Sequence, residues 1–350
     1  MQSFLSKKAK NISPYVAGEQ LNGADIIKLN TNENPYSASP KVFKAIKENL
    51  NADLKKYPKP DGGDFRIAAA KFVDMKKENI FCGNGSDEVL AFAFQAFFDP
   101  DKKLSMPEIT YSFYPVWADL YDIPINMIPL NDDFSINEKD YYSKDSVIIP
   151  NPNAPTGVAL SLDKIKSILD NNKHSIVIID EAYIEFGGTS AVCLIDDYNN
   201  LLVVRTLSKA QSLAGLRAGF AVGHPDLIDG LNRIKDSFNS YPVNKLTSVA
   251  AAAALNDKSY YDKINKKIIK TRLWTTKQLK KLDFSVVDSK ANFVFVSHKD
   301  KKAKDIYESL KEKNILVRWF NTKSIDNYLR ISIGTDKEME ELIDCLKQVL

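Results

Sequence analysis

Five short apolar runs in the middle of the chain constrain its fold most strongly. Several are apolar throughout instead of alternating with polar residues, which is typical of strands that are buried on both faces of a sheet. The runs are NIFC (79–82), SVIIP (146–150), SIVIID (175–180), LLVVR (201–205) and GFAVG (219–223). Segments with the helical spacing of apolar residues lie between them, at 87–98 and 161–172. This alternation predicts an α/β fold with a mostly parallel sheet that helices cover on both faces.

The pattern changes from about residue 250. A lysine-rich amphipathic helix is predicted over 262–282, and segments with strand character follow it at 284–289, 292–298, 315–320 and 328–334. Lysine-rich helices occur in nucleic-acid-binding proteins, but acidic residues are interspersed here and no basic strand studded with aromatic residues follows. We therefore expect a second, smaller α+β domain whose lysines face solvent.

Charge and cysteine content exclude several classes of partner. The 350 residues include 48 Lys and Arg against 45 Asp and Glu, interleaved along the chain, so we expect no nucleic-acid or membrane partner. The three cysteines and three histidines are too dispersed for a disulfide framework or a metal site. The N-terminus lacks the apolar core of a signal peptide, and no apolar run is long enough to span a bilayer. These features predict a cytoplasmic protein that acts on small molecules and binds no metal.

Residues that could bind a ligand or take part in a reaction follow four of the predicted strands. They lie at the end of the sheet where open parallel sheets bind ligands. The first group is GNGSDE (83–88), in which Gly85, Ser86 and Asp87 precede an apolar helix. The free N–H groups of such a helix start suit a phosphate, although a capped helix without any ligand has the same sequence. The run SVIIP leads into NPNAPTG (151–157), which by itself indicates only a turn.

Two further strands end in charged residues. Asp180 ends the run SIVIID, and Tyr183 follows three residues later. Burial of a carboxylate is unfavourable unless it is paired, but Asp180 would serve equally well as the cap of the next helix. The segment after LLVVR holds Ser208, Lys209 and Arg217 at a strand-to-loop junction. Because a single lysine is usually a solvated surface group, none of these residues is decisive alone.

Together, these segments meet the needs of one cofactor, pyridoxal 5′-phosphate. It requires a lysine amine for covalent attachment, a carboxylate facing the pyridine nitrogen and a phosphate-binding cup, with donors to its phenolate oxygen and an aromatic ring against its face. The residues that meet these needs are Lys209 for attachment, Asp180 for the nitrogen, Tyr183 for the phenolate oxygen, Tyr111 for the ring face, and Gly85, Ser86, Asp87, Ser208 and Arg217 for the phosphate. The sequence therefore predicts a pyridoxal-phosphate enzyme in which Lys209 is both the anchor and the proton-transfer group.

Eight segments resemble one enzyme family in the same chain order. They are TNENPY (31–36), KKYPKPDG (55–62), GNGSDE (83–88), ITYSFYP (109–115), NPNAPTG (151–157), DEAYIEF (180–186), RTLSKAQSLAGLRAGF (205–220) and YLRISIGT (328–335). On these segments the chain is similar to the fold-type I pyridoxal-phosphate aminotransferases, and among them to the histidinol-phosphate aminotransferases. The resemblance covers nearly the whole chain. The segment 209–217 and DEAYIEF are quite specific, whereas NPNAPTG has counterparts in many transaminases.

The resemblance implies a homodimer with an active site at each junction between two domains. Residues 30–245 would form a large domain that holds the cofactor on a sheet of the seven-stranded type, and residues 1–29 and 246–350 would form the small domain. Tyr57 resembles the family tyrosine that reaches the cofactor phosphate of the neighbouring subunit. From the residues alone, Tyr57 followed by proline indicates only a turn.

The resemblance also implies the substrates. Arg330 corresponds to the arginine that binds the substrate carboxylate in related enzymes, and Arg318 with Tyr15 resembles a clamp for the phosphate of histidinol phosphate. Asn32 is expected in the same substrate site. Guanidinium groups suit both anions because each anion accepts two parallel hydrogen bonds. The expected substrates are L-histidinol phosphate and glutamate with their oxo partners, imidazole-acetol phosphate and 2-oxoglutarate, although two ordinary strand arginines that face water would have the same sequence.

One position departs from the family pattern. Most relatives have an asparagine immediately before Pro-Thr-Gly, where it donates a hydrogen bond to the phenolate oxygen of the cofactor, whereas this chain has Ala154. Tyr183 would then carry that bond alone. Asn153 is a second candidate, but the side chains of adjacent residues in an extended loop point in opposite directions.

Two other kinds of protein share these features. An aromatic-amino-acid transaminase or an amino-acid-phosphate decarboxylase would keep the cofactor residues and change the arginine clamp. Outside enzymes, the alternative is a regulator that binds the cofactor without turnover. Such regulators usually carry an additional DNA-binding domain, for which we expect no room in this chain.

Lys209→Ala is expected to leave a folded protein with negligible turnover, because the variant lacks both the covalent anchor and the proton-transfer amine. Borohydride reduction of the unmutated protein, followed by peptide mapping, should label Lys209 alone. A label on any other lysine would contradict this assignment.

Overall fold

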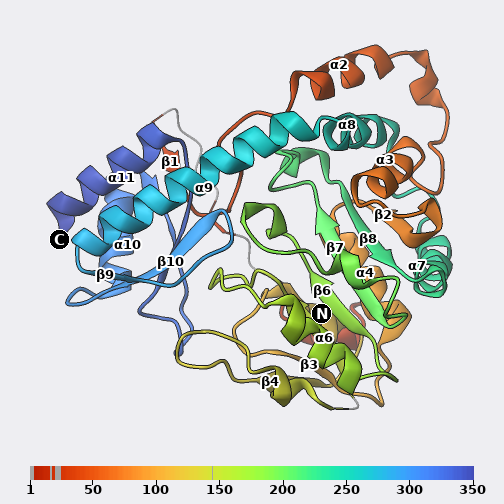
Figure 1. Cartoon of the computed structure of the whole chain (residues 1–350), viewed down its shortest axis with the longest axis horizontal. Coiled ribbons are helices and arrows are strands. Elements are labelled where there is room, and N and C mark those ends of the chain that lie inside the picture. The colour runs from red at the N-terminus through yellow and green to blue at the C-terminus, as the bar shows by residue number, and fades with distance from the viewer. Residues whose placement is uncertain (1–3, 16–17, 20–24, 144) are drawn as a thin grey trace.

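The computed structural model describes residues 4–15, 18–19, 25–143 and 145–350, and its largest element is a seven-stranded sheet (Figure 1). In spatial order the strands are β2 (Ile80–Gly83), β8 (Gly219–Gly223), β7 (Leu201–Thr206), β6 (Val177–Asp180), β5 (Ser146–Pro150), β3 (Leu104–Pro107) and β4 (Ile125–Ile128). Strand β8 runs antiparallel to both of its neighbours, and every other pair is parallel. The predicted mostly parallel sheet is confirmed.

Both faces of this sheet are buried because alternate residues of each strand pack against different helices. Val147 and Ile149 of β5 belong to the core on one face, while Ile148 belongs to the core on the other. The helices of the first face are α2 (Pro40–Asn49), α3 (Asp64–Phe72), α6 (Leu162–Asn171) and α8 (Lys245–Leu255), and those of the second are α4 (Ser86–Phe97), α5 (Phe113–Leu120) and α7 (Pro225–Phe238). Each fully buried aliphatic side chain contributes about 1.5–3 kcal/mol, which explains why these strands are apolar throughout.

A second, smaller sheet lies beside the first. Its four antiparallel strands have the order β12 (Arg318–Trp319), β13 (Leu329–Ser332), β10 (Phe293–His298) and β9 (Phe284–Val286). It shares a core with α9 (Lys258–Lys281), α10 (Ala303–Glu312) and α11 (Asp336–Val349). Figure 1 shows α9 running from α8 to this second sheet. The α+β composition of the C-terminal part is as predicted, and the exact limits of the two domains stay a prediction.

The single strand predicted over 315–320 is divided between two partners. Ile315–Leu316 (β11) pairs in parallel with Ile27–Lys28 (β1), whereas β12 pairs with β13. Val317 lies between the two paired segments and is buried, as are Ile315 and Leu316. The pattern of apolar residues does not distinguish these two short strands from one continuous strand, because the partner of each lies far away in the chain.

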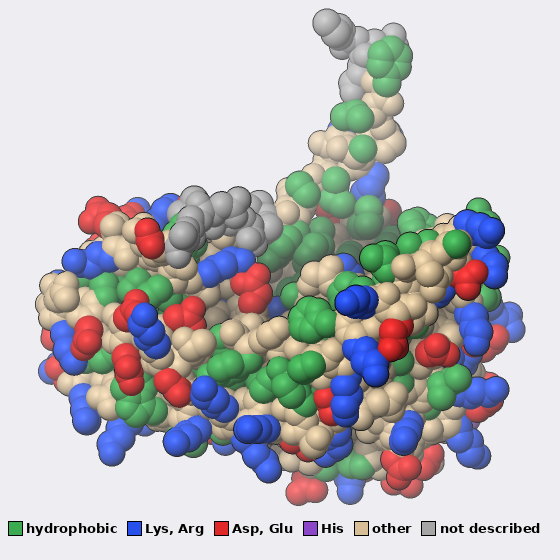
Figure 2. Space-filling model, turned by 90° about the horizontal axis from the view of Figure 1, so that it is seen from above, with side chains coloured by type: hydrophobic (Ala, Val, Ile, Leu, Met, Phe, Trp, Pro, Cys, Tyr) green, Lys and Arg blue, Asp and Glu red, His purple; other side chains and the backbone are tan. Residues whose placement is uncertain are grey.

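From Phe4 onward, the first described residues project from the body of the molecule, and Phe4 is fully exposed (Figure 2). Helix α1 (Lys7–Asn11) follows in the chain and contacts the end of α5. Its Lys8 Nζ donates to the Asp119 carbonyl at 2.5 Å and lies 2.6 Å from an Asp122 carboxylate oxygen. Within the residues that the structure describes, no helix combines the length and apolar character needed to cross a membrane. The same residues contain no cluster of His, Cys, Asp or Glu that could hold a metal ion.

Candidate active site

The carboxyl ends of the parallel strands surround one cavity. Eight of the residues predicted to bind the cofactor line it: Ser86, Asp87, Tyr111, Asp180, Tyr183, Ser208, Lys209 and Arg217. They come from the loops that follow β2, β3, β6 and β7, which all end at the same edge of the sheet. Residues far apart in the sequence are therefore brought together by strand direction alone, as expected for an open parallel sheet. We call this space the carboxyl-edge cavity.

Lys209 enters the carboxyl-edge cavity from the loop after β7. Its Nζ donates to the Thr31 carbonyl at 3.3 Å and lies 5.9 Å from the centre of the Tyr183 ring. No carboxylate among the described residues lies within ion-pairing distance of this amine. An amine that is held only by a carbonyl is available for covalent attachment to a carbonyl compound.

Asp180 is a buried carboxylate at the end of β6, only 4% exposed. The Tyr114 hydroxyl donates to one carboxylate oxygen at 2.7 Å, and the Ala182 N–H donates to the other at 3.2 Å. Burial raises the pKa of Asp180 to about 6, and the Tyr114 hydrogen bond opposes that rise. The group is therefore mainly ionised at neutral pH.

Tyr114 was not singled out from the sequence, although it contacts a predicted catalytic residue. It lies in the first turn of α5, three residues after Tyr111, and is fully buried. The spacing of three residues between Tyr111 and Tyr114 could have indicated that Tyr114 lies near the site, because residues with this spacing lie on one face of a helix. The partner of Tyr114, Asp180, lies 66 residues away, and no local pattern reveals it.

The start of α4 and Arg217 lie together at the place where a phosphate cup is predicted. Arg217 Nη2 lies 2.8 Å from an Asp87 carboxylate oxygen, and its Nη1 lies 3.4 Å from the Ser208 hydroxyl. The Tyr111 hydroxyl donates to the other Asp87 oxygen at 2.9 Å. Gly85 has φ +89°, and a Cβ added there would lie 2.6 Å from Arg217 Nη2. Glycine is therefore required, because only a residue without a side chain lets the guanidinium lie against the helix start.

A second cavity adjoins the first and holds the predicted substrate residues. Tyr15, Arg318 and Arg330 line it, and it shares Tyr111 and Ala154 with the carboxyl-edge cavity. Arg318 and Arg330 lie directly opposite each other on β12 and β13. We call this space the arginine cavity.

The two arginines of the arginine cavity have no acidic partner among the described residues. Arg330 donates to the Asn30 carbonyl at 3.0 Å, its Nε is buried without a partner, and its guanidinium lies 5.4 Å from the Phe293 ring centre. Burial lowers the pKa of Arg330. Like charges opposite each other across a ladder are destabilising, so an anion between Arg318 and Arg330 would relieve their repulsion.

Three predicted site residues line neither cavity, namely Gly85, Tyr57 and Asn32. Tyr57 is 82% exposed and stacks on Tyr241, with 4.8 Å between ring centres. Asn32 is 1% exposed, and its amide nitrogen donates to the Tyr183 hydroxyl at 3.0 Å. The expected contact of Asn32 with substrate stays a prediction, and the geometry connects it to Tyr183 instead.

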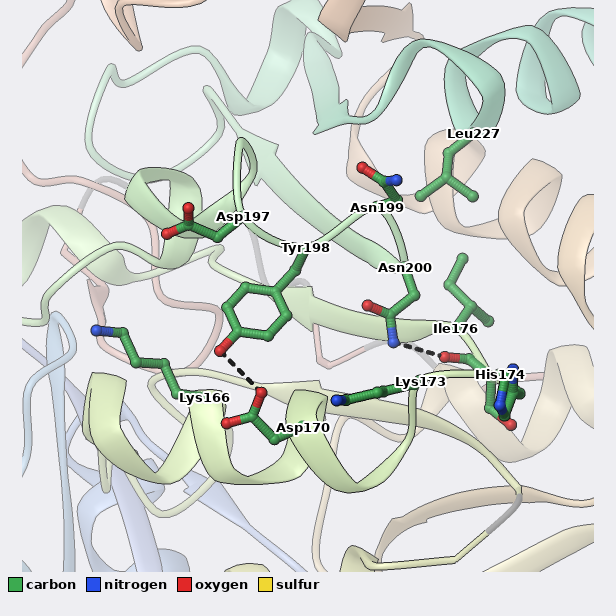
Figure 3. Close-up of a pocket in the computed structure, with 11 residues that line it drawn as sticks. Lys166, Asp170, Lys173, His174, Ile176, Asp197, Tyr198, Asn199, Asn200 and Leu227 are labelled. Carbon is green, nitrogen blue, oxygen red and sulfur yellow. Dashed lines mark hydrogen bonds between the residues drawn. The ribbon is translucent and has the colours of Figure 1, made fainter.

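A larger and more open hollow of about 670 Å³ lies at the opposite edge of the sheet, where β6 and β7 begin (Figure 3). None of the predicted site residues lines it. Three of its polar side chains bond within the protein: the Tyr198 hydroxyl donates to Asp170 at 3.1 Å, and the Asn200 amide donates to the Asn172 carbonyl at 3.0 Å. The candidate active site is therefore the pair of cavities at the carboxyl edge.

Comparison with known proteins places the chain in a family of enzymes that is consistent with this site. A family model described as aminotransferase class I and II matches residues 24–346, and the chain belongs to this class of enzymes. Within the class, it is a member of the histidinol-phosphate aminotransferase family. It is 51% identical over 351 residues to the histidinol-phosphate aminotransferase of Clostridium botulinum (strain Okra / Type B1), covering 100% of this chain and 99% of that protein. The enzyme of the same name from Clostridium acetobutylicum is 50% identical, with 100% of both chains covered.

Solved structures share the fold. The crystal structure of the histidinol-phosphate aminotransferase from Clostridium acetobutylicum aligns with a TM-score of 0.86 and 26% identity, over 93% of this chain and 99% of that chain. The Sinorhizobium meliloti histidinol-phosphate aminotransferase, solved in complex with pyridoxal-5′-phosphate, aligns with a TM-score of 0.89 and 23% identity, over 100% of this chain and 98% of that chain. The chain therefore has the fold-type I architecture.

Pyridoxal 5′-phosphate is the cofactor of this class, and the carboxyl-edge cavity fits it. Asp180 is a buried carboxylate with no cationic partner among the described residues, which suits a protonated ring nitrogen. The Lys209 amine opens into the same space, and the helix start beside Arg217 offers donors for a phosphate. Charge, donors and position all match the parts of the cofactor.

The pKa of Asp180 gives a test of this fit. Because that pKa is raised from 3.8 to about 6, the carboxylate is protonated as the pH falls through about 6 and then no longer attracts a cationic ring nitrogen. The affinity of the cofactor-free protein for pyridoxal phosphate is expected to fall below this pH by up to about tenfold per pH unit, the limit for one proton. Fluorescence titrations on both sides of this pH measure the effect. Asp180→Asn should bind more weakly and lose this step, and retention of the same step would contradict the assignment.

Proposed function

We propose that the protein transfers the amino group of L-histidinol phosphate to 2-oxoglutarate, which gives imidazole-acetol phosphate and L-glutamate, a reaction of histidine biosynthesis. The observation that carries this proposal is the arginine cavity. Two opposed guanidinium groups without an acidic partner adjoin the cofactor cavity, so a substrate amine can lie near Lys209 while its anionic end lies between Arg318 and Arg330. The names of the half-identical relatives support the same substrate.

The bound cofactor would supply an electron sink for the carbon from which a proton is removed, and it would carry the amino group between the two substrates. Lys209 would first anchor the cofactor and then, once displaced, accept the substrate proton on Nζ and return it. Its position beside Tyr183, with no carboxylate partner among the described residues, suits this role because the amine is free to move.

The remaining residues of the carboxyl-edge cavity would hold and tune the cofactor. Asp180 would keep the ring nitrogen protonated, since a buried carboxylate strongly favours a cation beside it. Tyr183 would donate to the phenolate oxygen, and Tyr111 would lie against the ring. The phosphate would be held by Arg217 and the residues around it, namely Gly85, Ser86, Asp87 and Ser208.

Arg318, Arg330 and Tyr15 would bind the anionic end of each substrate. A phosphate and a carboxylate both accept paired hydrogen bonds from a guanidinium, so one cavity can serve histidinol phosphate in one half of the reaction and glutamate in the other. Steady-state rates with histidinol phosphate, phenylalanine and threonine phosphate test the proposal. Faster turnover of phenylalanine would favour an aromatic transaminase, and release of carbon dioxide from threonine phosphate would favour a decarboxylase.

The functional unit in this proposal is a homodimer in the cytoplasm. Tyr57 is exposed beside Tyr241 and lines neither cavity of its own chain, which leaves it available to a neighbouring subunit. Leu54 and Phe43 are also exposed nearby in the chain.

The three cysteines are free thiols, in keeping with a reducing compartment. The division into a large domain of residues 30–245 and a small domain made from the rest belongs to the same proposal.

Removal of either arginine should impair phosphate-bearing substrates. Arg318→Ala and Arg330→Ala are each expected to lower kcat/KM for histidinol phosphate by about 30-fold or more, which corresponds to about 2 kcal/mol for a charged pair in a desolvated pocket. Arg330→Ala should also slow the reaction of glutamate. Arg233→Ala, at an exposed arginine of α7, is the matched control and should change neither rate. The substrate assignment would be wrong if histidinol without its phosphate reacted as well as histidinol phosphate.

Subunit mixing tests the position of Tyr57. Lys209→Ala and Tyr57→Ala chains are mixed under conditions that exchange subunits, and activity is expected to recover because one site of each mixed dimer then has both residues intact. Lys209→Ala mixed with Asp180→Asn is the control, since those residues line the same cavity of one chain and no intact site can form. An unrescued Tyr57 mixture would remove this residue from the neighbouring site.

A further inference from the structure

Asn32 occupies a strained, fully bonded position next to Tyr183. Its φ is +57°, in the left-handed region that few residues other than glycine and asparagine adopt. Its N–H donates to the Ser332 hydroxyl at 2.8 Å, and its carbonyl accepts from the Asn292 amide at 3.0 Å. The amide oxygen accepts from Ser332 at 2.9 Å, and the amide nitrogen donates to Tyr183 at 3.0 Å. Every polar atom of Asn32 is therefore in use.

These contacts fix the direction of the hydrogen bond to Tyr183. The Ser332 hydroxyl accepts the Asn32 N–H, so its own proton goes to the Asn32 amide oxygen. The NH2 group of Asn32 must then face Tyr183, and an amide N–H can only donate. The Tyr183 oxygen accepts this bond, which leaves its own proton without a partner among the described residues. Because Tyr183 lines the carboxyl-edge cavity, that proton is available to a ligand in the cavity.

The loop on the other side offers no equivalent donor. Ala154 lines the cavity but has no polar side chain. The Asn153 amide nitrogen donates to the Ile109 carbonyl at 2.9 Å, and the Asn153 amide oxygen is buried without a partner and can only accept. With the Asn153 donor engaged elsewhere, an anionic oxygen near Tyr183 depends on the tyrosine proton.

We propose that Asn32 is a positioning residue that fixes the Tyr183 hydroxyl as a donor into the cofactor cavity and so replaces the amide that Ala154 lacks. The inference rests on the proposed function, in which the phenolate oxygen of the cofactor lies at Tyr183. A hydroxyl that accepts a hydrogen bond becomes a stronger donor, so the contact strengthens the Tyr183 bond as well as directing it. Asn32 acts on the reaction only through Tyr183.

The test is a pH titration of the visible absorbance of the cofactor-loaded protein. A donor to the phenolate oxygen stabilises the deprotonated, more negative form of the chromophore, so weakening that donor raises the pKa of the titration. Asn32→Gly keeps the positive φ and removes the amide. It is expected to raise this pKa by about one unit, which equals about 1.4 kcal/mol and is the scale of one hydrogen bond.

Three further variants separate positioning from general structural damage. Tyr183→Phe should raise the same pKa, and Asn32→Gly added to Tyr183→Phe should raise it no further. Ala154→Asn should lower the pKa of the unmutated protein and reverse the rise in Asn32→Gly, because it adds a second donor. Asn32→Asp has the same shape and places an acceptor at Tyr183, so it should raise the pKa above that of the unmutated protein. This variant keeps the test available if the glycine variant does not fold.

The outcomes distinguish this inference from the proposed function. No shift in Asn32→Gly or Asn32→Asp, or an equal shift when Tyr183 is already phenylalanine, would overturn the positioning role while leaving the aminotransferase proposal intact. A shift in Asn153→Ala with none in Ala154→Asn would show that Asn153 is the second donor and would also overturn it. Unmutated protein that forms no absorbance band of a lysine-bound cofactor would overturn both.

Discussion

The burial of β5, β6 and β7 at every residue determines where this protein can carry out chemistry. A polar group inside such a strand must find a partner within the protein, because water cannot reach it. Arg205 of β7 shows what this requires: it lies 3.3 Å from Glu181 and 2.5 Å from Glu185. Burial raises the pKa of Glu181 to about 7, against the opposing effect of Arg205. Side chains that act on ligands are therefore found at the strand ends, where the loops open into the carboxyl-edge cavity.

The charged groups of the two adjoining cavities follow one another in space in an order that suits amino transfer. Asp180 provides a buried negative charge at one end, and Lys209 provides an amine that no carboxylate of the described residues holds. Beyond the shared wall of Tyr111 and Ala154, Arg318 and Arg330 provide two opposed positive charges. A substrate with an amine near Lys209 and an anion between the two arginines would match this order, since Asp180 is left to the cofactor and the anionic end meets opposite charges. The same order explains how one site can accept two different amino donors.

Local patterns predicted much of this arrangement, and long-range contacts account for the rest. The buried strands and the helices at 86–97 and 162–171 lie within a residue or two of their predicted positions, because period and capping are local properties. Strand direction then brought Asp180 and Lys209 together. The division of 315–320, the contact of Tyr114 with Asp180 and the contact of Asn32 with Tyr183 were not predicted. Each depends on a partner far away in the chain, which the spacing of residues does not reveal.

The central claim is that Lys209 would carry a cofactor that accepts the amino group of histidinol phosphate and passes it to 2-oxoglutarate. The most direct measurement is the visible absorbance spectrum of the purified, cofactor-loaded protein before and after addition of L-histidinol phosphate. We expect the band of the lysine-bound cofactor to disappear on addition of the amine and to return when 2-oxoglutarate is added. A band that is present but does not respond to histidinol phosphate would contradict the account.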